Sequence, residues 1–123
     1  MRVAVVGSRG LTVDNLGDYL PLGISMIISG GAKGIDSSAR EYAKAHGLEL
    51  VEFLPDYQKY GRGAPLRRNL EIITATDIVL IFWDERSKGS LFVLQNCKKL
   101  AVPFKVYVPD GAGSFTQKYS LGC

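Results

Sequence analysis

Short apolar runs alternate with segments of helical spacing along this chain, and the alternation constrains the fold more than any other feature. The apolar runs are RVAVVGS, ISMIISGG, LELVEFLP, IVLIFWD and PFKVYVPDG. They are rich in β-branched residues and end at glycine, proline or polar residues, which is typical of buried strands. The intervening segments carry apolar residues at helical spacing, as in KGIDSSAREYAKAHG, where Gly47 ends the predicted helix. The pattern therefore predicts about five strands separated by helices.

The composition of the strands predicts how they are arranged. Strands that are apolar throughout are buried on both faces, as in a parallel sheet covered by helices. Since connections between parallel strands are right-handed, we expect an α/β fold with a three-layer, doubly wound sheet. The expected strand order, numbered along the chain, is 3-2-1-4-5. The basic segment 56–66, DYQKYGRGAPL, is rich in turn residues and is predicted to be a loop.

The length of 123 residues fits one domain. We assign residues 1–110 to this domain and residues 111–123 to a C-terminal tail, which shows no clear period and is expected to fray. Hydrophobic residues make up 46% of the chain and charged residues 22%, which is enough apolar material for a core.

Charge, cysteine content and the first residues limit the possible partners and location. A net charge of +3 permits an anionic ligand but does not mark a general nucleic-acid binder. The apolar run 3–6 is too short for a signal-peptide core or a membrane span. Cys97 and Cys123 form neither a disulfide framework nor a metal-binding spacing. We therefore expect a cytoplasmic protein with no membrane partner, no metal and no cofactor.

Three predicted strands end in loops suited to a ligand: GSRG, SGGAKG and WDERSKGS. In a doubly wound sheet, ligands bind beyond the carboxyl ends of the strands where the strand order reverses, and the expected order brings these loops together there. A glycine-rich turn before a helix offers N–H groups and the positive end of the helix dipole to a phosphate. Arginine, lysine and serine side chains can add to such a site. The candidate ligand-binding residues are Gly7, Ser8, Arg9, Ser29, Gly30, Gly31, Ala32, Lys33, Gly34, Asp36, Arg67, Arg68, Asn69, Trp83, Asp84, Lys88, Gly89 and Ser90.

Several of these residues have a structural interpretation as well. Glycines between a strand and a helix often serve only the turn, and neither glycine-rich loop matches a dinucleotide or P-loop pattern. Asp36 would repel a phosphate, so we expect it to bond N–H groups of its helix or to orient a cation. Asp84 can accept a ribose hydroxyl or cap a turn. Trp83, Tyr57 and Tyr60 can pack at the surface or in the core, or stack on a base.

Four segments in this order resemble the SLOG superfamily: VVGSRG, IISGGAKGIDSSAREYAKAHG, APLRRNLEIITATDIVLIFWD and SKGSLFVLQ. This superfamily joins the DNA-processing protein A (DprA/Smf) domain to the Lonely Guy phosphoribohydrolases. The chain resembles in particular its small stand-alone YspA-type members, over nearly all residues up to Asp110. The resemblance implies a Rossmann-like fold with a pocket for a nucleotide or nucleotide-derived ligand, and it is compatible with a homodimer.

The two named branches of the superfamily imply different activities. SGGAKGID and PLRRN are similar to the DprA pattern, whose equivalent residues contact phosphates of single-stranded DNA. The Lonely Guy enzymes cleave the N-glycosidic bond of a nucleoside monophosphate with an arginine and with the glutamate of PGGxGTxxE. Arg67 or Arg68 matches that arginine. Phe92 and Val93 stand where the acid is required.

The resemblance therefore leaves three functions to compare. We expect a module that binds a phosphate-bearing nucleotide or nucleotide-derived ligand as a sensor. The alternatives are a single-stranded DNA-binding module and a nucleotide N-glycosidase in which Asp84 or Glu85 replaces the missing acid. Whether the chain is an enzyme stays open at this point.

Overall fold

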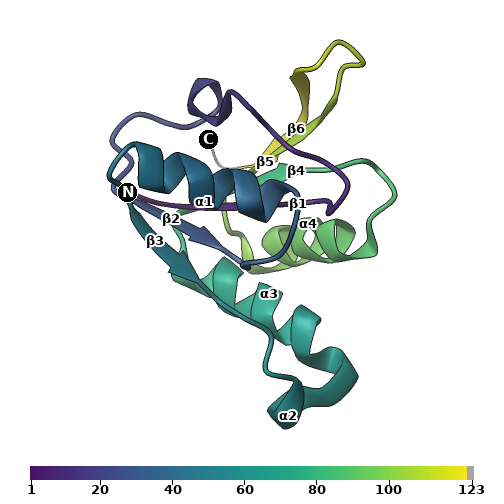
Figure 1. The fold of residues 1–123 in the computed structure, drawn as a ribbon. Helices are drawn as coiled ribbons and strands as arrows, with labels where there is room; N and C mark the ends of the chain where they lie inside the picture. Colours follow the sequence, from purple (N-terminus) through teal and green to yellow (C-terminus); the bar gives the residue numbers. More distant parts are fainter. Residues whose placement is uncertain (122–123) are drawn as a thin grey trace.

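A six-stranded sheet lies between two layers of helices in the computed structural model, which describes residues 1–121 (Figure 1). Its order is β3-β2-β1-β4-β5-β6, in which β1 to β5 pair in parallel and β6 is antiparallel to β5. The α/β class and the order of the first five strands are confirmed, and the sheet has one strand more than the sequence predicted. The strands are β1 (Arg2–Gly7), β2 (Met26–Ser29), β3 (Glu49–Glu52), β4 (Ile78–Phe82), β5 (Phe104–Pro109) and β6 (Phe115–Leu121).

Both faces of the sheet are covered, as apolar strands require. Helix α1 (Ile35–Ala45) covers one face, and helices α3 (Ala64–Ala75) and α4 (Lys88–Leu100) cover the other (Figure 1). On β1, Val3 and Val5 belong to the cluster under α1, whereas Ala4 and Val6 belong to the cluster under α3 and α4. The alternation of side chains along each strand thus supplies two cores.

Strand β6 was not predicted from the sequence, which assigned residues 111–123 to an irregular tail. Phe115 attaches the strand to the core, because its ring lies 5.0 Å from that of Phe82 and 6.0 Å from that of Tyr19. Its N–H group donates to the Tyr19 hydroxyl at 3.0 Å. The other side chains of β6 are exposed, so the strand lacks the apolar pattern that identified its neighbours. Cys123 lies outside the described residues.

The basic segment after β3 is also more regular than predicted. It forms α2 (Tyr57–Tyr60) and the 3₁₀ turn η2 (Gly61–Gly63), which extend from the body of the molecule beside α3 (Figure 1). A further 3₁₀ turn, η1 (Leu16–Asp18), precedes β2. Helix α3 begins at Ala64, inside the segment 56–66 that was predicted to be a loop. Pro65 is compatible with this start, since proline is tolerated in the first turn of a helix.

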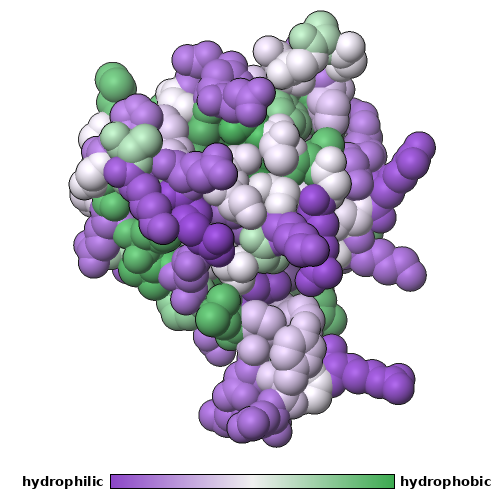
Figure 2. Space-filling model, in the orientation of Figure 1, coloured by the Kyte–Doolittle hydropathy of each residue, from purple (hydrophilic) through white to green (hydrophobic). Residues whose placement is uncertain are grey.

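Hydrophilic side chains predominate on the face shown in Figure 2, and they interrupt the apolar areas. In the part of the chain that the structure describes, no helix is long and apolar enough to cross a membrane.

Candidate functional site

A pocket of about 370 Å³ lies where the strand order reverses, next to β1 and β4. Its walls come from the loops after β1, β2 and β4 and from the helices α1, α3 and α4. This is the place at which doubly wound sheets bind their ligands. The lining residues are Val6, Gly7, Ser8, Arg9, Gly10, Gly30, Ala32, Asp36, Pro65, Leu66, Arg68, Asn69, Ile72, Asp84, Ser87, Gly89, Ser90 and Val93.

The structure thus brings together candidate residues from all three loops and from α3. Those that line the pocket are Gly7, Ser8, Arg9, Gly30, Ala32, Asp36, Arg68, Asn69, Asp84, Gly89 and Ser90. The remaining candidates, which lie outside the lining, are Ser29, Gly31, Lys33, Gly34, Arg67, Trp83 and Lys88. Among the lining residues that were not candidates, Ser87 could have been identified, because a serine directly before a helical segment is a capping signal.

The glycines of the loop after β2 allow the chain to approach its neighbours closely. A β-carbon on Gly30 would lie 2.5 Å from Nη1 of Arg68. Gly34 has a φ of 73°, and a β-carbon there would overlap the carbonyl oxygen of Arg9. Packing alone therefore requires glycine at both positions, whatever the pocket binds.

Arg68 is the buried cation of the pocket lining, and only 9% of the residue is exposed. Its Nη1 donates to the carbonyl oxygen of Gly30 at 2.7 Å, and its Nε donates to Oδ1 of Asn69 at 2.8 Å. Burial lowers the pKa of the guanidinium, and the nearby Asp36 carboxyl opposes this shift. Since Oδ1 of Asn69 is occupied by Arg68, the NH₂ group of Asn69 is the part of that amide available to a ligand.

Asp36 is the buried acid of the pocket, with 6% of the residue exposed. Burial raises its pKa, and this effect exceeds the opposing contributions of the Ala32 N–H group, Arg68 and Ser29. The Ala32 N–H group donates to Oδ2 at 3.1 Å. Among the described residues, no group forms a hydrogen bond with the Ser29 Oγ, although this hydroxyl lies close enough to Asp36 to lower its pKa. Asp36 also lies in the first turn of α1, so its carboxylate competes with any other anion there.

Asp84 closes the turn between β4 and α4. Its Oδ1 accepts the N–H groups of Arg86 and Ser87, both at 2.8 Å, and its own N–H group donates to Oγ of Ser8 at 3.1 Å. Partial burial works to raise the pKa of Asp84. The N–H groups of Ser87 and Arg86, with Ser8 and the charge of Arg86, outweigh this and keep the pKa below its ordinary value of 3.8. The carboxyl is therefore ionised near neutral pH.

The N-terminus of α4 is the most favourable place in the pocket for an anion. Ser87 caps the helix by accepting the Ser90 N–H group at 3.3 Å, and the first turn contains no acidic residue. Within residues 1–121, no hydrogen bond uses the N–H groups of Lys88 and Gly89 or the hydroxyl of Ser90. Ser90 is only 4% exposed and lines the pocket, so its hydroxyl lies next to the space that a ligand would occupy. Trp83 supports the same turn, since its Nε1 donates to the Ser87 carbonyl oxygen at 3.0 Å.

Comparison with protein families supports the resemblance to the SLOG superfamily. Residues 1–60 of the 123-residue chain match the model of the YspA, cpYpsA-related SLOG family. This part of the chain is similar to a SLOG domain. The comparison with curated proteins found no match. The matched part contains β1, β2 and the loops that follow them, whereas Arg68, Asp84 and α4 come from the remaining part of the chain.

The positions that the resemblance aligns with the Lonely Guy glutamate, Phe92 and Val93, hold no acid. Val93 lines the pocket, and Phe92 does not. Glu85, which the sequence offered as a replacement, also lies outside the lining, and its carboxylate forms an ion pair of 2.7 Å with Lys118. Of the two replacement acids considered, only Asp84 lines the pocket.

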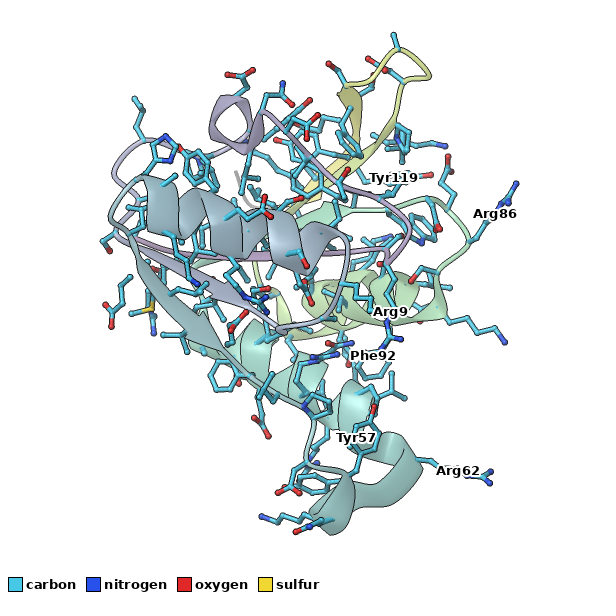
Figure 3. The ribbon with its side chains drawn as sticks, viewed as in Figure 1. Arg9, Tyr57, Arg62, Arg86, Phe92 and Tyr119 are labelled. Atoms are coloured by element: carbon cyan, nitrogen blue, oxygen red, sulfur yellow. The ribbon has the colours of Figure 1, made fainter. Side chains whose placement is uncertain are left out.

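The arginines in and around the pocket differ in their exposure and in their distance from the lining. Arg9 is exposed at the pocket wall, whereas Arg62 and Arg86 extend away from the molecule (Figure 3). Arg67 lies over the ring of Tyr60, 5.1 Å from its centroid, and hydrogen bonding from Arg67 and Lys59 lowers the pKa of that tyrosine. Arg9 is thus the exposed arginine of the pocket, and Arg68 is the buried one.

Proposed function

We propose that this pocket binds a nucleotide or nucleotide-derived ligand through its phosphate, and that the protein acts as a sensor or ligand-binding module. The observation that carries the proposal is the N-terminus of α4. There the N–H group of Gly89, which has no partner among the described residues, and the Ser90 hydroxyl line the same pocket as the exposed Arg9. Helix N-termini attract phosphate because N–H groups and the helix dipole act together. The similarity of residues 1–60 to a SLOG family supports a nucleotide-related ligand.

The phosphate would be held by α4 rather than by the glycine-rich loop after β2. In that loop Gly30 packs on Arg68, and the N-terminus of α1 carries the carboxylate of Asp36. The N–H group of Gly89, the Ser90 hydroxyl and the Arg9 guanidinium would contact the phosphate oxygens. Arginine binds phosphate well because its planar fork can donate two parallel hydrogen bonds.

The size of the pocket favours a small nucleotide. Ligand pockets span about 300–1,000 Å³, and the volume here, about 370 Å³, is at the lower end of that range. The NH₂ group of Asn69 and the carboxylate of Asp84 would orient the sugar or base. A nucleoside monophosphate fits this combination better than a dinucleotide does.

Gly89→Glu is the sharpest test of the phosphate position. A β-carbon on Gly89 would meet no atom closer than Ser87 Oγ at 4.0 Å, so the backbone there can carry a side chain. Glutamate in the first turn of a helix should stabilise the free protein, by about 1 kcal/mol, since it replaces glycine and faces the helix dipole. The same carboxylate should abolish phosphate binding. The measurement is thermal unfolding of parent and variant with and without ligand.

Gly63→Glu is the matched control for this variant. Gly63 precedes α3, meets no atom within 4 Å of an added β-carbon and does not line the pocket. The Gly63→Glu substitution introduces the same charge outside the pocket, so the ligand response of this variant should equal that of the parent. Equal ligand binding by the parent and Gly89→Glu proteins would contradict the proposed position of the phosphate.

The ligand panel distinguishes the proposal from the DNA-binding alternative. It contains AMP, GMP, ADP-ribose, NAD and a short single-stranded oligonucleotide, each at low and high salt. A ligand at 100 times its dissociation constant stabilises the protein by about 2.7 kcal/mol. We expect a shift from a mononucleotide that persists at high salt. A shift from the oligonucleotide alone, lost at high salt, would identify a DNA-binding module.

A further inference from the structure

Asp84 is held in one orientation at the edge of the proposed phosphate site. Two N–H groups at 2.8 Å occupy its Oδ1, and one of them belongs to Ser87, the capping residue of α4. The Ser87 hydroxyl in turn accepts the N–H group of Ser90. A single short turn therefore connects the carboxylate of Asp84 to the groups proposed to bind phosphate.

The second oxygen of this carboxylate is available to a ligand. Among the described residues, no N–H group donates to Oδ2 of Asp84, and Asp84 lines the pocket. The Ser8 hydroxyl lies close enough to this carboxylate to lower its pKa, and a carboxylate oxygen with two lone pairs can accept a ligand donor beside it. Because an ionised carboxylate only accepts hydrogen bonds, the ligand must present a donor to it. A phosphate cannot meet this requirement, since it is negatively charged and has no donor when fully ionised.

The donor must also lie close to the phosphate, because Asp84 and the N-terminus of α4 are neighbours. In a nucleotide the sugar joins the phosphate to the base, so the hydroxyl groups of the sugar are the donors nearest the phosphate. Vicinal hydroxyls suit a carboxylate oxygen, which has two lone pairs.

We propose that Asp84 accepts hydrogen bonds from the ribose hydroxyls, so that the pocket selects ribonucleotides over 2′-deoxyribonucleotides. The inference rests on the proposed function and narrows its substrate class to phosphorylated ribosides. Asp84 is then the specificity-determining residue of the pocket. Asp36 is less accessible than Asp84, because only 6% of the residue is exposed.

The test compares matched pairs of ribonucleoside and 2′-deoxyribonucleoside 5′-monophosphates by calorimetric titration of the whole chain. The four matched pairs, one for each base, are AMP and dAMP, GMP and dGMP, CMP and dCMP, and UMP and dUMP. A hydrogen bond to a charged group predicts that the parent binds the ribonucleotide about ten- to hundredfold more tightly.

Asp84→Asn should remove this preference while preserving the turn. The asparagine Oδ1 can still accept the N–H groups of Arg86 and Ser87, so the variant should fold. Its affinity for ribonucleotides should decrease. Its affinity for deoxyribonucleotides and for inorganic phosphate should stay the same or increase, because a negative charge near the phosphate is removed.

Asp110→Asn is the matched control. Asp110 closes a similar turn, accepting the N–H groups of Ala112 and Ser114 at 2.7 and 3.1 Å, and it does not line the pocket. This variant should keep the parent's preference for ribose. The comparison separates the loss of a ribose contact from a general effect of replacing a turn aspartate.

Each outcome has a distinct meaning. Equal binding of ribo- and deoxyribonucleotides by the parent would overturn the inference and leave the proposed function standing, and this comparison does not depend on any variant. An unchanged preference in Asp84→Asn would overturn the assignment to Asp84. Failure of every nucleotide and of inorganic phosphate to bind the parent would overturn the proposed function itself.

Discussion

Single residues of the loop after β2 show why a glycine-rich sequence is not by itself a phosphate site. Gly30 permits contact with the Arg68 guanidinium, which is 38 positions away in the sequence. Gly34 permits contact with the chain that follows β1. These contacts assemble the floor of the pocket. The residues proposed to hold the phosphate are instead Gly89 and Ser90, which lie at a helix start with less conspicuous sequence.

The pH dependence of stability tests the environment of Asp36. Its raised pKa means that, between its ordinary value of 3.8 and the raised value, the folded protein keeps a proton that the unfolded chain releases. The contribution of Asp36 to stability should therefore fall as the pH rises through this window. Denaturant unfolding of the parent and of Asp36→Asn across pH 3 to 8 measures this contribution. As the pH rises, the free energy of unfolding of the parent should decrease relative to that of the variant.

Asp77→Asn provides a control of opposite sign. Hydrogen bonds from Arg2 lower the pKa of Asp77, so its contribution is present above pH 3.8 and is lost as the pH falls through the lowered value. Asp77 is exposed, and its effect should be the smaller one. An Asp36 contribution that increased with pH would contradict the environment described here.

At the scale of elements, the attachment of β6 to the core depends on the first residue of the strand, Phe115. Phe115 packs against Tyr19 and Phe82, whereas the side chains that follow are exposed. The strand also contacts the loop between β4 and α4 through the ion pair formed by Lys118 and Glu85. Exposed pairs of this kind contribute little, about 0–1 kcal/mol, so the aromatic contact should dominate.

Phe115→Ala should loosen β6 selectively. We expect a loss of about 2 kcal/mol, because the ring is partly buried in an aromatic cluster. Hydrogen exchange should accelerate in the amides of β6 and remain slow in β1 and β4. Tyr119→Ala, at a side chain that is 43% exposed, is the control and should change little. Equal acceleration in all strands would show that β6 folds together with the rest of the sheet.

At the scale of the whole molecule, α4 joins the pocket to the core. Its first turn contributes Gly89 and Ser90 to the pocket, and its middle contributes Val93, Leu94 and Cys97 to the cluster under the sheet. Cys97 is fully buried, and burial raises the pKa of its thiol to about 12. The thiol can therefore react only when the helix leaves the sheet.

Alkylation of Cys97 should consequently report global unfolding. We expect no iodoacetamide adduct on Cys97 in the native protein at neutral pH, and complete reaction in concentrated urea. Peptide mass spectrometry distinguishes this cysteine from Cys123. A ligand that stabilises the fold should slow the reaction further. Rapid modification of Cys97 under native conditions would contradict the burial of α4.

The sequence alone was sufficient for the α/β class, the order of the five parallel strands and the position of the pocket. Apolar runs, helical spacing and glycine turns are local patterns, and a parallel sheet places the carboxyl ends of its strands at one edge. The tertiary structure decided β6, which is attached through Phe115, and it decided which residues face the pocket. Packing between distant segments buries Arg68, raises the pKa of Asp36 and leaves one oxygen of Asp84 available, and no local pattern encodes such contacts.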